Sequence, residues 1–166
     1  GKFDGSVQLT QLQDATASGN FDGFVLFAND GTVVQPAVEE AIDAGIKVVA
    51  VYTPIGPDIN SLDQQVPGLV ATVANPIEGD GIGMGEATVD ACGDTDPCNV
   101  IYVSGGFSIP FEVAKFDAFK RVIGESSNIK LVGQGEAGFL REEGYKVAQD
   151  LLQANPDVNV YVTSGD

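Results

Sequence analysis

The two cysteines and two aspartates of the segment CGDTDPC have the spacing that comes nearest to a reactive or metal-binding site. Cys92 and Cys98 have five residues between them, unlike the C-x-x-C spacing of redox and zinc sites. Asp94 and Asp96 would offer Ca²⁺ two carboxylates, whereas that ion prefers about six to eight oxygen ligands. The intervening Gly, Asp and Pro residues indicate a turn. The favoured interpretation is a disulfide that closes a short loop, with two reduced cysteines as the alternative.

Two further segments resemble catalytic or nucleotide-binding motifs without matching them. Ser104 in YVSGG lacks the glycine that a G-x-S-x-G nucleophile elbow requires two positions earlier, because Tyr102 stands there. In GDGIGMGEA, the third glycine of a G-x-G-x-x-G fingerprint that starts at Gly81 would fall at Glu86. The charge of that glutamate would repel a pyrophosphate, so the segment is interpreted as the glycine-rich start of a helix.

The overall composition narrows the possible chemistry further. The 166 residues include no histidine, which excludes Ser-His-Asp and Cys-His catalysis and His-ligated metal sites within the chain. The net charge is −16, from 24 acidic and 8 basic residues, and it argues against binding to nucleic acid or to an anionic membrane surface. We therefore predict no catalytic residue, no metal site and no cofactor, and expect a protein that is not an enzyme.

Apolar runs alternate with amphipathic segments along the whole chain. Such alternation is typical of βαβ units in open, doubly wound parallel sheets, whose strands are buried on both faces. Helices are predicted at 6–17, 36–44, 77–92, 110–123 and 142–154, and strands at 24–28, 46–53, 99–106, 129–136 and 158–166. The apolar stretch LVATVANP, residues 69–76, is interpreted with the polar loop before it as a crossing between two sheets. Pro36 is expected in the first turn of its helix. The apolar face of helix 110–123 is expected to comprise Phe111, Ala114, Ala118 and Val122.

Polar and aromatic residues gather where the predicted strands end. Ligands of open α/β sheets bind beyond the carboxyl ends of the strands. Groups that can hydrogen-bond and stack, without a nucleophile or base, suit a small polar ligand better than catalysis. Ordinary strand-to-helix turns remain the alternative interpretation. The residues concerned are Asn29, Asp30, Tyr52, Thr53, 104–108, 134–139 and 164–166.

Three long segments resemble type 1 periplasmic binding proteins of the ribose-binding kind. DGFVLFANDGTVVQPAVEEAIDAGIKVVAVYTP, residues 22–54, is similar to a stretch of the first domain of that family. VSGGFSIPFEVAKFDAFKRVI, residues 103–123, is similar to a strand and helix of the second domain. GFLREEGYKVAQDLLQANPDVNVYVTSGD, residues 138–166, is similar to the later helix, NPD turn and strand. The order in which the three segments follow one another is more specific for this family than any one segment alone.

The resemblance implies a two-lobed α/β fold that is incomplete at both ends. In this interpretation residues 1–74 are part of the N-terminal lobe and residues 75–166 are most of the C-terminal lobe. The first hinge crossing would lie near 74–77, at Asn75 and Pro76. The family's chain would begin earlier and continue past Asp166, so the absence of a signal peptide from GKFDGSVQLT carries no information about location.

The resemblance also implies a function. Proteins of this family capture a sugar or similar solute between two lobes and deliver it to the membrane subunits of an ABC importer. They are extracytoplasmic, either periplasmic or lipoproteins of the cell surface. The ligand-binding residues carried over or placed at strand ends are Asn29, Asp30, Tyr52, Thr53, Phe107, Gln134, Phe139, Gly165 and Asp166.

Several of these positions depart from the family's pattern. Phe139 matches an aromatic residue that stacks on the ligand, and Gly165-Asp166 matches a pair that usually reads Asn-Asp. Tyr52 and Thr53 stand where sugar binders often have Asp-Arg, and Val113 stands near a usual arginine. The missing charges imply either a ligand other than a common pentose or hexose, or replacement by Asn29, Asp30 and Gln134.

Three other functions remain open from the sequence. The effector-binding domain of a lactose-repressor-type transcription regulator shares this fold, but a disulfide would argue against a cytosolic protein. A nucleotide-dependent α/β enzyme is disfavoured by the missing histidines and the unmatched glycine fingerprint. A surface receptor domain of the same fold is the last alternative.

Overall fold

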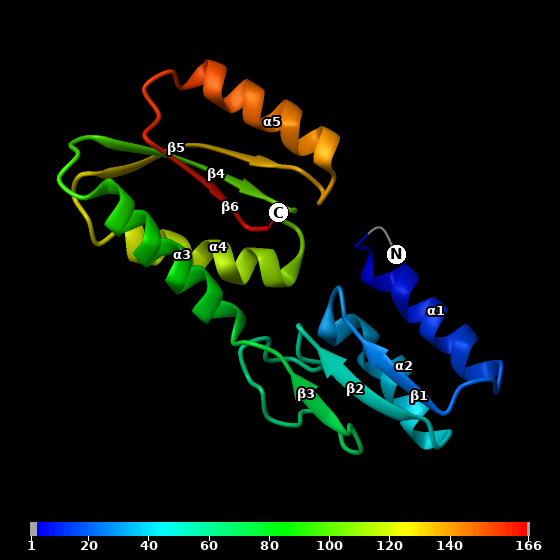
Figure 1. The fold of residues 1–166 in the computed structure, drawn as a ribbon. Helices are drawn as coiled ribbons and strands as arrows, with labels where there is room; N and C mark the ends of the chain where they lie inside the picture. The colour runs from blue at the N-terminus through cyan, green and yellow to red at the C-terminus, as the bar shows by residue number, and fades with distance from the viewer. Residues whose placement is uncertain (1–2, 166) are drawn as a thin grey trace. The chain divides into compact units, whose positions relative to one another are not determined.

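A computed structural model describes residues 3–165 of the chain. The chain divides into two compact units, unit 1 comprising Gly1–Ile77 and unit 2 comprising Glu78–Asp166. The division follows residue 77. Each unit is an α/β structure with a parallel sheet, which confirms the predicted fold class (Figure 1). None of the described helices has the length and apolar character that a membrane crossing requires.

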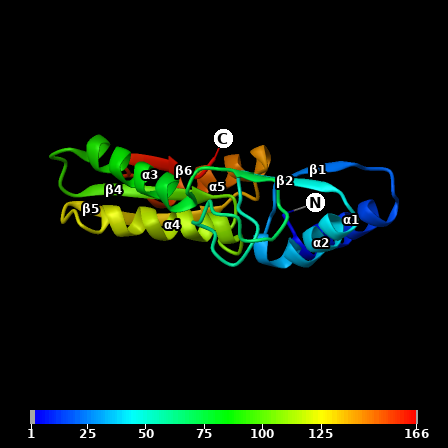
Figure 2. The ribbon, with the colours of Figure 1, turned by 90° about the horizontal axis from the view of Figure 1, so that it is seen from below.

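Unit 1 contains a three-stranded parallel sheet in the order β1-β2-β3, and its two helices lie on one face of that sheet (Figure 2). The apolar stripe of the second helix supplies most of the core, with Val34, Ala37, Val38 and Ala41 packed in one cluster with Val48 of the sheet. The elements are α1 (Gly5–Ala17), β1 (Gly23–Leu26), α2 (Gly31–Asp43), β2 (Lys47–Val51) and β3 (Ala71–Val73).

The helix predicted to begin near Pro36 begins five residues earlier, so Pro36 lies inside α2 rather than in its first turn. The cause is Asp30, whose carboxylate accepts hydrogen bonds from the backbone N–H groups of Thr32 and Val33 at 2.9 and 3.0 Å. This N-cap satisfies donors that otherwise have no partner within the helix. The sequence showed an Asn-Asp-Gly turn there, and the same aspartate both ends the turn and starts the helix.

The face of the unit 1 sheet opposite the helices carries valines and no described helix. Val25 of β1 is 77% exposed and Val73 of β3 is 63% exposed. We expected strands buried on both faces, and for this sheet the expectation is wrong within the described residues. The sequence does not distinguish the two cases, because both valines have the side chains of a buried strand.

Unit 2 contains a second parallel sheet in the order β5-β4-β6. Two helices, α3 and α4, cover one face of this sheet and α5 covers the other (Figures 1 and 2). The central strand β4 is buried along nearly its whole length, and Tyr102 packs there against Phe116 and Phe119. The elements are α3 (Ile77–Cys92), β4 (Cys98–Ser104), α4 (Pro110–Ile123), β5 (Ile129–Glu136), α5 (Arg141–Ala154) and β6 (Val160–Thr163).

The glycine-rich segment of α3 is a helix–helix contact. A Cβ atom on Gly81 would lie 2.2 Å from the carbonyl oxygen of Lys115 in α4. A Cβ atom on Gly85, one turn later, would lie 2.6 Å from Cβ of Val122. Only glycine lets the two helix backbones approach this closely. The segment is therefore helical throughout, and its glycines serve packing.

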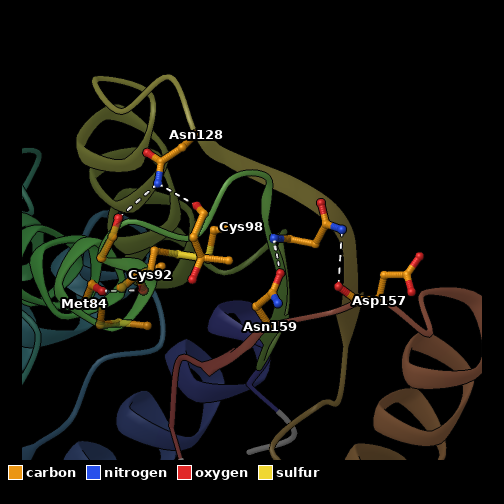
Figure 3. The surroundings of a disulfide bond; sticks show 10 residues. Met84, Cys92, Cys98, Asn128, Asp157 and Asn159 are labelled. Carbon is orange, nitrogen blue, oxygen red and sulfur yellow. Dashed lines mark hydrogen bonds between the residues drawn. A yellow bond between two sulfur atoms is a disulfide. The ribbon is translucent and has the colours of Figure 1, made fainter.

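The predicted disulfide is present between Cys92, the last residue of α3, and Cys98, the first residue of β4 (Figure 3). A residue outside the loop that the disulfide closes, Asn128, also fixes the loop's backbone. The side-chain Nδ2 of Asn128 donates hydrogen bonds to the carbonyl oxygens of Gly93 and Thr95 at 3.1 and 2.8 Å. The disulfide and Asn128 together fix the connection between α3 and the central strand.

Reducing this disulfide is expected to lower the free energy of unfolding of unit 2 by about 2 kcal/mol, because the open loop gains conformational freedom in the unfolded chain. Urea denaturation with and without reductant measures the difference. The double variant Cys92→Ser/Cys98→Ser serves as the control and should not respond to reductant. Equal urea midpoints for the oxidised and reduced protein would contradict the expectation.

Candidate ligand-binding site

The carboxyl end of β1 leads into a segment in which the ring of Phe27 is exposed, Asn29 is buried and the carboxylate of Asp30 caps a helix. Gln8 of α1 holds the backbone here: its Nε2 donates to the carbonyl oxygen of Phe27 at 2.7 Å, and its Oε1 accepts from the N–H of Asn29 at 2.9 Å. The Phe27 side chain is 38% exposed, whereas Asn29 is only 9% exposed. Asp30 caps α2 as described above.

The carboxyl end of β2 makes a sharp turn centred on Tyr52. The N–H of Thr53 donates to the carbonyl oxygen of Val51 at 2.8 Å, and Tyr52 between them has φ = 67°. A bulky residue with positive φ in a three-residue turn is strained. The N–H of Tyr52 also donates to the carbonyl oxygen of Val73 in β3 at 3.0 Å. Thr53 is fully buried, and its hydroxyl has no hydrogen-bond partner among the described residues.

The turn brings the ring of Tyr52 against the ring of Phe27. Their centroids are 4.9 Å apart and their planes meet at 65°, so that one ring presents its edge to the other. Tyr52 was predicted as a ligand-binding residue and Phe27 was not. Phe27 was missed because it lies within the apolar run of residues 24–28, which predicts a buried strand. The usable signal was its place as the first residue after β1.

In unit 2 a buried ion pair lies beneath the carboxyl ends of β4 and β6. Glu112 and Lys115 of α4 are 0% and 2% exposed, and Lys115 Nζ lies 2.5 Å from Oε1 of Glu112. The other carboxylate oxygen accepts from the hydroxyl of Ser104 at 2.8 Å and from the N–H of Gly105 at 2.9 Å. Lys115 Nζ donates to the carbonyl oxygen of Ser164 at 3.0 Å. One pair of side chains therefore ties both strand ends to α4.

The ion pair changes the acidity of the groups around it. Burial alone would raise the pKa of Glu112, but the hydrogen bonds that its carboxylate accepts, first of all from Lys115, together with the charge of Lys115, hold it below its usual value. The neighbouring phenol of Tyr102 has its pKa raised, first by burial and then by the negative charge of Glu112. Glu112 is thus a carboxylate whose role is to hold backbone and hydroxyl groups in place.

The ring of Phe139 rests on the backbone at the end of β4. A Cβ atom on Gly105 would lie 2.0 Å from Cζ of Phe139, so that only glycine leaves room for the ring. Phe139 itself has φ = 54°, the left-handed region that bulky residues avoid. It stacks with Phe111 at 6.2 Å between centroids. An open hollow of about 530 Å³ adjoins it, lined by Phe139, Leu140, Arg141 and Gly144.

The remaining predicted site residues lie in different surroundings. Gln134 is exposed but lies inside β5, two residues before its end. Phe107 packs its ring on Phe116 at 4.9 Å, and its N–H donates to a carboxylate oxygen of Glu136 at 2.9 Å. Gly165 is exposed at the end of β6, close to the ring of Phe139. Asp166 lies outside the described residues.

Taken together, each unit presents aromatic rings at the carboxyl ends of its strands, with side chains behind them that fix the backbone. The rings are Phe27 and Tyr52 in unit 1 and, in unit 2, Phe139, which stacks on the buried ring of Phe111. No group of three or more His, Cys, Asp or Glu side chains suitable for a metal ion occurs among residues 3–165. The arrangement suits ring stacking and hydrogen bonding to a small ligand.

Comparison with known proteins gives one family and a consistent fold. The profile described as periplasmic binding protein domain matches residues 1–166. An ABC transporter periplasmic solute-binding protein from Actinobacillus succinogenes 130z, with bound D-allose, has a similar structure with a TM-score of 0.77 and 20% identity. The match covers 99% of this chain and 55% of that one. No curated protein matches the chain.

Two further solved structures are similar in the same way. An ABC transporter solute-binding protein from Burkholderia graminis C4D1M, in complex with D-arabinose, has a TM-score of 0.78 and 19% identity over 98% of this chain and 52% of that one. A galactofuranose-binding protein has a TM-score of 0.79 and 20% identity over 98% of this chain and 53% of that one. The chain therefore spans about half the length of these structures, and the likeness is one of fold.

Proposed function

Because the chain belongs to the periplasmic binding protein domain family, we propose that it captures a sugar or sugar-like solute for an ABC importer. Its role in this proposal is binding and delivery, without catalysis. The similar structures contain bound D-allose and D-arabinose, and they carry the same fold. Since the chain spans about half the length of those structures, the activity proposed is that of the whole protein.

The observation that supports this proposal most strongly is the placement of the aromatic rings. In each unit they lie at the carboxyl ends of parallel strands, where open α/β sheets bind ligands. An aromatic face stacks well on the carbon–hydrogen face of a sugar ring. We propose that the ligand binds against the rings at these strand ends.

The disulfide supports an extracytoplasmic location, because the cytosol keeps thiols reduced. The protein is accordingly proposed to be periplasmic or a lipoprotein of the cell surface, and its partners to be the membrane subunits of the importer. The same disulfide argues against the effector-binding domain of a transcription regulator.

Native mass spectrometry of the full-length protein, purified from its own organism, tests the proposal. The expected result is a protein that carries a small neutral solute and is two mass units lighter than its reduced form. Releasing the solute and identifying it would name the ligand. A protein with free thiols and no affinity for any sugar in calorimetric titration would overturn the proposal.

Gly105→Ala is expected to weaken binding of the identified sugar by about tenfold, because the new methyl group displaces the ring of Phe139 and the stacking contact is lost. Isothermal titration calorimetry measures the loss. Gly106→Ala is the matched control, since its Cβ atom would meet only the flexible end of Ile109, at 3.1 Å. Equal affinities for the two variants would show that Phe139 does not stack on the ligand.

A further inference from the structure

The strand ends of unit 1 present few polar side chains: the phenol of Tyr52 is exposed, the amide of Asn29 is largely buried, and no basic side chain lies there among the described residues. Among residues 27–30 and 52–53, the more exposed side chains are the rings of Phe27 and Tyr52. Thr53 is fully buried, and the carboxylate of Asp30 is occupied by the cap of α2. Lys47 is the one basic residue among the described residues of unit 1, and it lies at the opposite end of β2.

The two rings are held in place by the backbone. Gln8 fixes the segment of Phe27 through two hydrogen bonds, to the carbonyl oxygen of Phe27 and the N–H of Asn29. The turn at Tyr52 is fixed by the hydrogen bond between Thr53 and Val51. Glycine would adopt the positive φ of Tyr52 without strain. A tyrosine that occupies such a position points to a use for its ring, because strained residues cluster at functional sites.

We propose that Phe27 and Tyr52 form an apolar subsite, which receives a methyl group or a carbon–hydrogen edge of an uncharged ring ligand. The two ring planes meet at 65°, so their carbon faces form a corner that suits an apolar group, and the phenol of Tyr52 is the one group of the two side chains that can pair with a hydroxyl. This inference rests on the proposed function and adds a substrate class to it. The protein should prefer a deoxy sugar to its hydroxylated parent, and either to a sugar acid.

Calorimetric titration of the full-length protein with D-galactose, 6-deoxy-D-galactose and D-galacturonate tests the subsite, with D-glucose and 6-deoxy-D-glucose as a second pair. Wild type is expected to bind a deoxy sugar about tenfold more tightly than its parent, since one methyl-sized contact discriminates to that degree. D-galacturonate is expected to bind most weakly. Phe27→Ala and Tyr52→Gly should each reduce the preference severalfold, and Tyr52→Phe, which restores the ring, should recover it.

Stability separates a binding role of the rings from a structural one. Tyr52→Gly removes the ring and also relieves the positive φ, so the urea midpoint is expected to stay level or rise while the preference falls. Phe21→Ala is the matched control, because Phe21 is exposed before the amino end of β1 and should leave the preference unchanged.

The outcomes distinguish this inference from the function on which it rests. Tight binding of a parent sugar with no deoxy preference, or a preference that survives Phe27→Ala and Tyr52→Gly, overturns the subsite alone. A Tyr52→Gly variant that loses stability but keeps the preference also overturns it. A wild-type protein that binds none of these sugars at millimolar concentration counts against both the subsite and the proposed function.

Discussion

Lys115→Met is expected to lower the free energy of unfolding of unit 2 by about 3–5 kcal/mol. Methionine keeps the length of the lysine side chain but removes its charge. Glu112 then remains fully buried without a counter-charge, held by neutral donors such as the hydroxyl of Ser104 and the N–H of Gly105. Breaking a buried ion pair at one partner is among the most destabilising single changes, because desolvation of the remaining charge is no longer offset. Urea denaturation followed by circular dichroism measures the loss.

The double variant Glu112→Gln/Lys115→Met provides the control. Glutamine fills the same space and can still accept from the Ser104 hydroxyl and the Gly105 N–H, so most of the lost stability should return. If the double variant is as unstable as Lys115→Met, the loss comes from the shape of the methionine and the account based on charge is wrong.

The dependence on pH gives an independent signature of the same pair. In wild type the pKa of Glu112 is held below its unfolded value, so its stabilising contribution is present above that value and is lost as pH falls through the folded pKa. In Lys115→Met the positive charge beside Glu112 is gone, so burial is expected to raise the pKa of the Glu112 carboxyl. The penalty of the variant should then shrink as acid protonates the carboxyl, and a penalty that is equal at neutral and acidic pH would contradict this reasoning.

Gly81→Ala is expected to destabilise unit 2 by about 3 kcal/mol, whereas Gly83→Ala should stabilise it by about 1 kcal/mol. The two glycines lie two positions apart in α3, but on different faces. A Cβ atom on Gly81 would lie 2.2 Å from the backbone oxygen of Lys115, which cannot move without shifting α4. A Cβ atom on Gly83 would meet nothing within 4 Å, so alanine brings only its higher helix propensity.

Thermal and urea denaturation of the two variants side by side measure this contrast. Both variants replace glycine with alanine in the same helix, so the change in helix propensity is the same for both. The difference between their free energies of unfolding therefore measures the packing of α3 on α4. Similar effects of the two substitutions would mean that α3 does not pack on α4 through its glycines.

The sequence predicted the alternation of strands and helices well, because the apolar runs and turn residues are local signals. It also indicated the disulfide, since a short loop rich in Gly, Asp and Pro brings Cys92 and Cys98 together. The start of α2 was misjudged because two local signals competed. Asp30 and Pro36 can each mark a first turn, and the cap at Asp30 prevailed.

The candidate site was less accessible to sequence reasoning, because it depends on contacts between distant segments. Of the apolar face expected for α4, Phe111 and Ala118 are buried, whereas Ala114 and Val122 are half-buried. The buried face also includes residues that were not expected: Phe116, Phe119, Ile123 and the charged Glu112 and Lys115. Hydropathy cannot place a charged residue inside unless its partner is known, and the partners here include Ser104, the last residue of β4, and Ser164, which follows β6.

Unit 1 and unit 2 each have a hydrophobic core of their own, so a destabilising substitution acts on the unit in which it lies. Each unit can melt as its own cooperative block, so a single melting temperature would average two events. A lesion such as Gly81→Ala would then loosen the block that carries Phe139 and leave the block that carries Phe27 and Tyr52 folded. Calorimetry of such a protein would record two melting transitions, of which only the one that belongs to unit 2 is shifted to lower temperature.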